Sequence, residues 1–178
     1  LGLLVDQSGD DRYLAGDFAQ GTGYFFGVGL LHDENGDDEY RGSRYAQGAG
    51  VHQAIGLAID SAGNDLYSAL EAAAQGSGFD ASVGILDDHA GDDRYRGGTL
   101  AQGAASMNGL GILMDRKGRD RYRAKSGQGY GGSTSYWGGR NAKNCGVLID
   151  LEGVDRFNLP PRRDRAGSQP EAGLIVDR

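Results

Sequence analysis

The strongest constraint on this chain is an internal repeat. Aligning it on the glycine that precedes each apolar triplet gives spacings of 27, 27, 28, 27, 35 and 27 residues. The aligned glycines are Gly2, Gly29, Gly56, Gly84, Gly111, Gly146 and Gly173. Six full units and the start of a seventh fill residues 1–178, which we interpret as a single repeat domain. Periods of this size are typical of solenoids and similar arrays.

Each unit carries two aspartates around a glycine turn, followed by an aromatic residue, as in "DENGDDEY" from Asp33 to Tyr40. The first Asp column is Asp6, Asp33, Asp60, Asp88, Asp115 and Asp150, continued by Asp177. The second Asp column is Asp11, Asp38, Asp65, Asp93, Asp120 and Asp155. Two residues later, Tyr13, Tyr40, Tyr67, Tyr95, Tyr122 and Phe157 form an aromatic column. We expect that column to be stacked and buried.

The pattern predicts an all-β fold. Apolar runs such as "GLLVD" and "GLAID" indicate short strands, and Asp-x-x-Gly supplies a turn after each. Glycine accounts for 33 of the 178 residues without a collagen period, which indicates close backbone packing. Three short strands per unit favour a parallel β-helix of about six 27-residue coils. An antiparallel β-meander or barrel is the alternative, because Asp-x-x-Gly also suits hairpins.

Stacked coils would place identical aspartates about 4.8 Å apart. Two unit charges at that distance repel by roughly 3.5 kcal/mol at an effective dielectric constant of 20. Bound cations between the two Asp columns would relieve this repulsion, and calcium suits carboxylate oxygens. The arginines beside the second Asp column are the other candidates for compensation: Arg12, Arg94, Arg121 and Arg156. The aspartates can also satisfy backbone donors of the turns without any metal.

Two segments, "AGNDLYS" (62–68) and "AGDDRYRGG" (90–98), resemble the nonapeptides of RTX, or haemolysin-type, calcium-binding repeats. The resemblance implies a β-roll in which the second Asp column and turn carbonyls hold calcium. The implied ligands are Asp11, Asp38, Asp65, Asp93, Asp120 and Asp155. In the family the motif recurs every nine residues, whereas here it occurs once per unit.

A glutamine recurs in the later part of five units. Glutamines at Gln20, Gln47, Gln75, Gln102 and Gln128 predict an amide ladder along the stack.

The fifth unit is longer than the others, and its excess residues contain Tyr130, Tyr136, Trp137 and Arg140. Insertions in solenoids often carry binding, so we expect these four residues to contact a sugar or a protein surface, or Trp137 to cover the core.

Composition narrows the functional classes. The net charge of −7 argues against nucleic acid as the main partner. Cys145 is the only cysteine, and no apolar run reaches membrane-spanning length. The chain starts at Leu1 inside a repeat, which we interpret as part of a longer protein.

We expect a structural or adhesive module of a bacterial surface or secreted protein, stabilised by calcium. No catalytic set is recognisable, so a carbohydrate-active β-helix enzyme, such as a polysaccharide lyase or glycosidase, is an alternative that rests on analogy of fold. Self-assembly into a filament or homo-oligomer through exposed strand edges is another.

Overall fold

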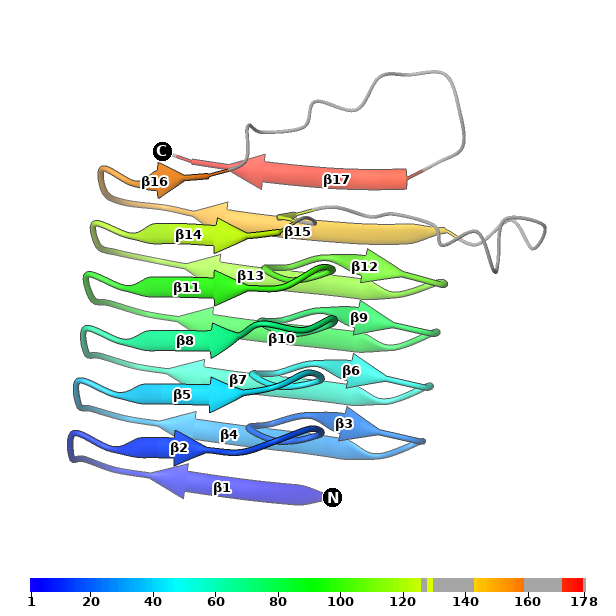
Figure 1. Cartoon of the computed structure of the whole chain (residues 1–178), viewed down its shortest axis with the longest axis horizontal. Coiled ribbons are helices and arrows are strands. Elements are labelled where there is room, and N and C mark those ends of the chain that lie inside the picture. Colours follow the sequence, from blue (N-terminus) through cyan, green and yellow to red (C-terminus); the bar gives the residue numbers. More distant parts are fainter. Residues whose placement is uncertain (126–127, 130–142, 159–170, 178) are drawn as a thin grey trace.

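The computed structural model describes residues 1–125, 128–129, 143–158 and 171–177. The chain forms a stack of coils in which the strands of one repeat pair in parallel with their copies in the next (Figure 1). The prediction of a parallel β-solenoid is therefore confirmed, and the antiparallel meander is wrong. All elements assigned in these residues are strands, and no helix among them is long and apolar enough to cross a membrane.

Three parallel sheets run along the stack. Sheet A contains β1 (Gly2–Asp6), β4 (Val28–Asp33), β7 (Ile55–Asp60), β10 (Val83–Asp88), β13 (Leu110–Asp115), β15 (Asn144–Asp150) and β17 (Glu171–Val176). Sheet B contains β2 (Arg12–Leu14), β5 (Glu39–Gly42), β8 (Leu66–Ala69), β11 (Arg94–Gly97), β14 (Arg121–Ala124) and β16 (Arg156–Phe157). Sheet C contains β3 (Gly23–Tyr24), β6 (Gly50–Val51), β9 (Gly78–Phe79) and β12 (Ala105–Ser106).

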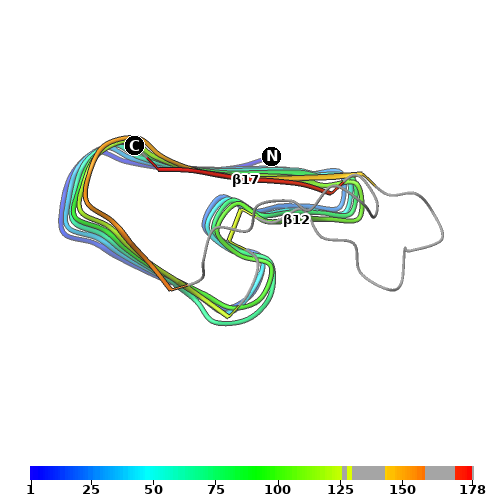
Figure 2. The same cartoon turned by 90° about the horizontal axis from the view of Figure 1, so that it is seen from above.

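The register of the sheets places identical positions of successive units side by side. In sheet A, Asp33 pairs with Asp60, and Asp88 pairs with Asp115. In sheet B, Tyr95 lies between Tyr67 and Tyr122. Viewed along the stack, successive coils nearly superpose (Figure 2). Each side chain inside the coil therefore has its own copies as neighbours.

The core lies between sheets A and B. Side chains alternate across a strand, so β10 buries every second residue, including Leu86. Leu31, Leu113 and Leu148 occupy equivalent buried positions and pack against the tyrosines of sheet B. Ala58 occupies this position in the remaining inner coil, so each coil contributes one aliphatic side chain and one aromatic ring to the core.

The aromatic column is a continuous stack of parallel rings. Neighbouring ring centroids from Tyr13 to Phe157 lie 4.6–4.9 Å apart, and neighbouring planes differ by 1–5°. Tyr40, Tyr67, Tyr95 and Tyr122 are at most 2% exposed. The prediction of a stacked, buried column is confirmed, because in-register strands impose their own spacing on the rings.

The glutamines are buried as a column, but the predicted amide ladder is wrong for most of them. The side-chain amides of Gln47, Gln75 and Gln102 donate to backbone carbonyl groups of sheet B instead of to one another. Only Gln128 donates to the amide oxygen of a neighbouring glutamine, Gln102, at 2.7 Å in the described residues. The glutamines therefore attach the loop after sheet B to its strands.

The glycine that follows each glutamine lets this loop press against sheet A. Gly76 has a φ of +70°, in the left-handed region, and a Cβ atom there would collide with the backbone carbonyl oxygen of Ile112. Neither the backbone conformation nor the space tolerates a side chain. The Gln-Gly pair thus combines one residue that anchors the loop with one that allows close approach.

We predict that Gly76→Ala lowers the free energy of unfolding by about 3 kcal/mol or more, because it forces a backbone collision in the middle of the stack. Gly16→Ala is the matched control, since a Cβ at Gly16 meets no atom within 4 Å. Urea denaturation of both variants measures the difference. Equal stability of the two variants would contradict this packing.

Candidate metal centre

The two Asp columns meet at the corner between sheets A and B. The first Asp column ends the strands of sheet A, and the second lies just before the strands of sheet B. The two aspartates of a coil are five positions apart in the sequence, as in Asp60 and Asp65, and the glycine turn folds them back toward each other. Both columns therefore enter the interior at the same corner of every coil.

The first Asp column caps its own turn and receives the tyrosine hydroxyls. Oδ1 of Asp60 accepts a hydrogen bond from the backbone N–H of Ala62 at 3.1 Å, and Oδ1 of Asp115 accepts one from Lys117 at 3.2 Å. The prediction that these aspartates satisfy turn donors is confirmed at such positions. Oδ2 of Asp60 accepts the hydroxyl proton of Tyr40 at 2.6 Å.

Farther along the stack a hydroxyl lies between two carboxyl groups. The Tyr95 hydroxyl is 2.8 Å from Oδ2 of Asp115 and 3.0 Å from Oδ2 of Asp88. The Tyr122 hydroxyl is 2.9 Å from both Asp115 and Asp150. A hydroxyl has one proton to donate, so it can satisfy only one of its two carboxylate neighbours fully.

The second Asp column links each coil to the next. One carboxylate oxygen of each aspartate accepts the backbone N–H of its copy in the preceding coil, at 2.6 Å for Asp93 with Asp65 and 2.7 Å for Asp120 with Asp93. The other oxygen is buried and has no hydrogen-bond partner among the described residues. This holds for Asp38, Asp65, Asp93, Asp120 and Asp155.

The two columns together form four clusters of three aspartates, in each of which the candidate ligand atoms lie within 4.8 Å of one another. The clusters are Asp38/Asp60/Asp65, Asp65/Asp88/Asp93, Asp93/Asp115/Asp120 and Asp120/Asp150/Asp155. Each contains both aspartates of one coil and the second-column aspartate of the coil before. Neighbouring clusters share a residue, so they form one continuous line.

In two of the clusters every member has an unpartnered oxygen. Oδ1 of Asp88 and Oδ1 of Asp150 lack hydrogen-bond partners among the described residues, as do the second-column oxygens beside them. A buried polar atom without a partner is costly, and a charged one is more costly still. If all these carboxyl groups were ionised, their buried negative charge would lack compensation by hydrogen bonds or by positive groups.

Not every predicted ligand joins a cluster. Asp6, Asp11 and Asp33 belong to no group of three among the described residues. Asp33 instead accepts the Tyr13 hydroxyl at 2.5 Å and caps the turn at Asn35. The predicted contact residues Tyr130, Tyr136, Trp137 and Arg140 lie outside the described residues.

The arginines beside the second Asp column do not neutralise it, so that alternative is wrong. Arg12, Arg94, Arg121 and Arg156 are exposed on the outer face of sheet B, while the aspartates before them face inward. No ion pair among the described residues joins an arginine to either Asp column. Alternation along a strand separates the two charges, because adjacent residues point to opposite faces.

Burial and the neighbouring carboxylates hold many of these protons tightly. Burial, with the charges of nearby aspartates, raises the pKa of Asp65 to about 8, that of Asp93 to about 11 and that of Asp120 to about 9. Burial also raises the pKa of Asp115 to about 6, while hydrogen bonds from Tyr95 and Tyr122 oppose the rise. Protons or cations must therefore compensate the corner near neutral pH.

Without a bound cation, we predict that the chain loses stability as the pH rises. An aspartate in an unfolded chain has a pKa near 3.9. In the folded chain the pKa of Asp65 is about 8 and that of Asp120 is about 9. Between about pH 4 and these raised values, the folded state therefore binds more protons than the unfolded state. The free energy of unfolding must fall across this range, by more than about 3 kcal/mol between pH 5 and pH 8.

Urea denaturation in the presence of a chelator at pH 5 and at pH 8 tests this dependence. A free energy of unfolding that stays constant or increases toward pH 8 would show that the buried carboxyl groups do not hold their protons in the folded state.

The clusters also fit a cation by size and chemistry. Calcium binds oxygen ligands at about 2.3–2.6 Å, so three oxygens around one ion lie within about 5 Å of one another. The separations within the clusters meet that limit. The clusters contain carboxylates only, without histidine or cysteine, and such donors suit hard cations better than zinc or copper.

Sequence reasoning missed two aspects of the site. It treated the tyrosines as core residues, although their hydroxyls contact the first Asp column. The spacing of two residues between each second-column aspartate and its tyrosine was the available signal. It also missed that each cluster draws on two successive coils, which follows from the three-dimensional stacking.

Comparisons with protein-family models, curated proteins and solved structures found no significant match. The chemistry of the corner therefore has to be argued from its own residues.

Proposed function

We propose that this chain is a structural β-solenoid module of a bacterial surface or secreted protein, and that divalent cations, calcium foremost, bind between its two Asp columns. The observation that carries the proposal is the row of buried carboxylate oxygens without hydrogen-bond partners, which recurs at the same corner of successive coils.

Geometry supports a row of sites. The carboxylates of Asp65, Asp88 and Asp93 each contribute a buried, unpartnered oxygen to one cluster, and Asp120, Asp150 and Asp155 do so in another. In the other two clusters the first-column member, Asp60 or Asp115, accepts one backbone N–H at 3.1–3.2 Å as well as tyrosine hydroxyl contacts. Bidentate carboxylates would supply further oxygens of the six to eight that calcium takes.

Charge supports the same arrangement. Nine different aspartates make up the four clusters. Four divalent ions would bring eight positive charges to these nine carboxylates and would leave the corner nearly neutral. A monovalent ion in each cluster would leave five carboxylates to be neutralised by protons. A divalent cation is therefore the better match to the number of acidic groups.

Such sites would make the module's rigidity depend on its surroundings. Each ion would join two coils, because each cluster spans two coils. Binding would add to the backbone ladders and the ring stack in holding the coils in register. Extracellular modules bind calcium with dissociation constants of about 10⁻⁴–10⁻³ M, which is consistent with a surface or secreted protein.

A carbohydrate-active enzyme is less well supported. Glycosidases need two carboxyl groups that face an open groove and flank the sugar bond. The clustered aspartates are buried, most of them at 0–3% exposure, where a sugar chain has no access. Two surface hollows along sheet B are lined mainly by arginine, and a third, of about 470 Å³, has Glu71 as its one carboxylate, so none of the three offers paired carboxylates.

Thermal unfolding at pH 8 with calcium and with chelator tests the proposal. Calcium at about 10 mM is ten to a hundred times a dissociation constant of about 10⁻⁴–10⁻³ M and stabilises the folded state by about 1.4–2.7 kcal/mol per site. We therefore expect calcium to raise the melting temperature by roughly 10 °C or more. Identical melting temperatures in millimolar calcium and in chelator would exclude cation binding at the corner.

Asp93→Asn is a sharper test, because it should raise the stability of the chain without calcium and reduce the stabilisation that calcium brings. The amide oxygen can still accept the N–H of Asp65, while the amide is neutral at every pH, so this position no longer has to take up a proton on folding and no longer offers a carboxylate to two clusters. With chelator at pH 8 we expect Asp93→Asn to be more stable than the parent chain by about 1–3 kcal/mol. With calcium we expect its gain in melting temperature to be clearly smaller.

Asp92→Asn is the matched control. Asp92 precedes Asp93 and also accepts a backbone N–H from the next coil, that of Arg119 at 3.1 Å, but it is exposed and belongs to no cluster. It should leave the calcium response unchanged. If both variants respond to calcium as the parent chain does, the clusters are not the binding sites.

A further inference from the structure

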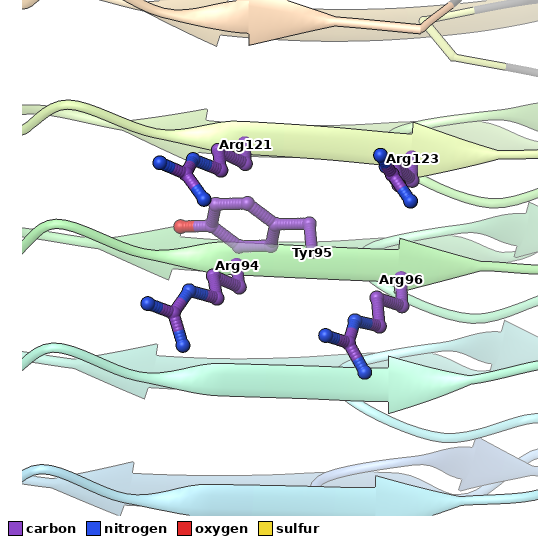
Figure 3. A pocket seen from close by; sticks show the side chains of 5 residues that line it. All are labelled: Arg94, Tyr95, Arg96, Arg121 and Arg123. Carbon is purple, nitrogen blue, oxygen red and sulfur yellow. The ribbon is translucent and has the colours of Figure 1, made fainter.

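The outer face of sheet B carries a group of exposed arginines. Arg94 and Arg96 project from β11, Arg121 and Arg123 from β14, and Arg156 from β16. We call these five residues the arginine face. Figure 3 shows four of them as two rows on neighbouring strands, with the Tyr95 ring behind the sheet. The face is strongly cationic on a chain whose net charge is −7.

Register aligns like charges on this face. Arg94 pairs in register with Arg121, which pairs with Arg156, and Arg96 pairs with Arg123. Like charges directly opposite each other on adjacent strands are unfavourable. Among the described residues, none of the five arginines forms an ion pair. The face therefore concentrates positive charge without an internal counter-charge.

The same face is built differently in the first two coils. There Glu39 lies in register with Arg12, accepts a hydrogen bond from its Nε at 2.8 Å, and also forms an ion pair with Arg41. The intervening strand β8 presents Leu66 and Ser68, which carry no charge. Positive charge is thus partly neutralised at one end of sheet B, where Glu39 pairs with two arginines, and left without an ion pair among the described residues at the other.

Shallow hollows separate the arginine rows. One of about 230 Å³ lies between the side chains of β11 and β14. The next, of about 240 Å³, is lined by Arg121, Arg123 and Arg156 and shares two arginines with the first. The hollows follow one another along the stack, so their common occupant would be extended and would run across the strands.

We propose that the arginine face binds a linear acidic polysaccharide through its carboxylate or sulfate groups. Guanidinium groups bind planar and tetrahedral oxyanions with paired hydrogen bonds. Along the stack the arginines recur at the strand spacing of about 4.8 Å, and along a strand two residues span about 6.6 Å. An extended polyanion that runs along the stack would pass from the arginines of one strand to those of the next, and would meet at least one arginine in each of these coils.

A polysaccharide fits this face better than nucleic acid does. Proteins that bind single strands combine positive charge with aromatic side chains on which the bases stack. The aromatic rings of sheet B in these coils, Tyr95, Tyr122 and Phe157, face the core, where the two tyrosines are buried and Phe157 is half-buried at the end of the ring stack. The arginine face offers charge and hydrogen-bond donors without a stacking platform. The proposal is independent of cation binding, which concerns the opposite side of the sheet.

Binding of the intact chain to immobilised polysaccharides at constant calcium tests the proposal. Dextran sulfate and unmodified dextran share one backbone and differ in charge, polygalacturonate supplies carboxylates, and a single-stranded oligonucleotide represents nucleic acid. We expect dextran sulfate or polygalacturonate to bind, dextran not to bind, and added salt to weaken the interaction. Which of the two polyanions binds more tightly identifies the anionic group.

The variant Arg121→Ser/Arg123→Ser removes two arginines that line both hollows, and should weaken binding by about tenfold. Arg12→Ser/Arg44→Ser is the matched control, because it removes the same charge from arginines already paired with Glu39 and Asp17. It should change binding less than about twofold. Melting temperatures confirm folding, and Arg94→Ser/Arg96→Ser replaces the first variant if that one does not fold.

Three results would overturn the proposal. The first is failure of both polyanions to bind. The second is equal weakening by the arginine-face variant and the matched control, which would mean that only overall charge matters. The third is tighter binding of the oligonucleotide than of either polysaccharide, which would identify the face as a nucleic-acid surface.

Discussion

The whole structure depends on one constraint, the in-register parallel stacking of nearly identical coils. Each side chain has its own copy above and below it, at the spacing of hydrogen-bonded strands. A residue type can recur along a column only if two identical side chains can pack at that spacing without a steric clash or charge repulsion. Tyrosine rings do so by stacking, with centroids 4.7 Å apart between Tyr95 and Tyr122. Glycine does so by leaving room for the neighbouring backbone.

Aspartate meets this constraint only in part. One carboxylate oxygen of each second-column aspartate accepts a backbone N–H of the preceding coil, and this bond makes the residue useful in every coil. The other oxygen then faces further carboxylates in a buried corner. The same stacking that builds the hydrogen-bond ladder also builds the repulsion. Protons relieve it at low pH, and cations offer a way to relieve it at higher pH.

The period of the strand separates the opposite charges of each unit. The residue between a second-column aspartate and its tyrosine points outward, so Arg94 and Arg121 lie on the surface while Asp93 and Asp120 lie inside. The repeat therefore produces an acidic line within the solenoid and, in its later coils, a cationic face outside it. The net charge of the chain reveals neither feature, because it adds the negative charges of the acidic line to the positive charges of the cationic face.

Much of the fold was predictable because it is periodic. The spacing of the glycines, the strand-like triplets and the recurring aspartates and aromatics indicated a solenoid and the columns within it. The pairing of Asp-x-x-Gly turns with a buried ring stack followed from the same pattern. The amide ladder was predicted wrongly, because the sequence does not reveal that backbone carbonyl groups of sheet B lie nearer to Gln47 and Gln75 than other amides do.

The sequence alone determined the repeat, its short strands and turns and the residue types in each column, since these depend on local pattern and on equal spacing. Only the tertiary structure decided that the strands pair in parallel, which aspartates share a cluster, and that no arginine forms an ion pair with either Asp column in the described residues. The physical reason is that clusters form between coils and across a corner. Their members depend on the angle at which two strands meet and on the face to which each side chain points.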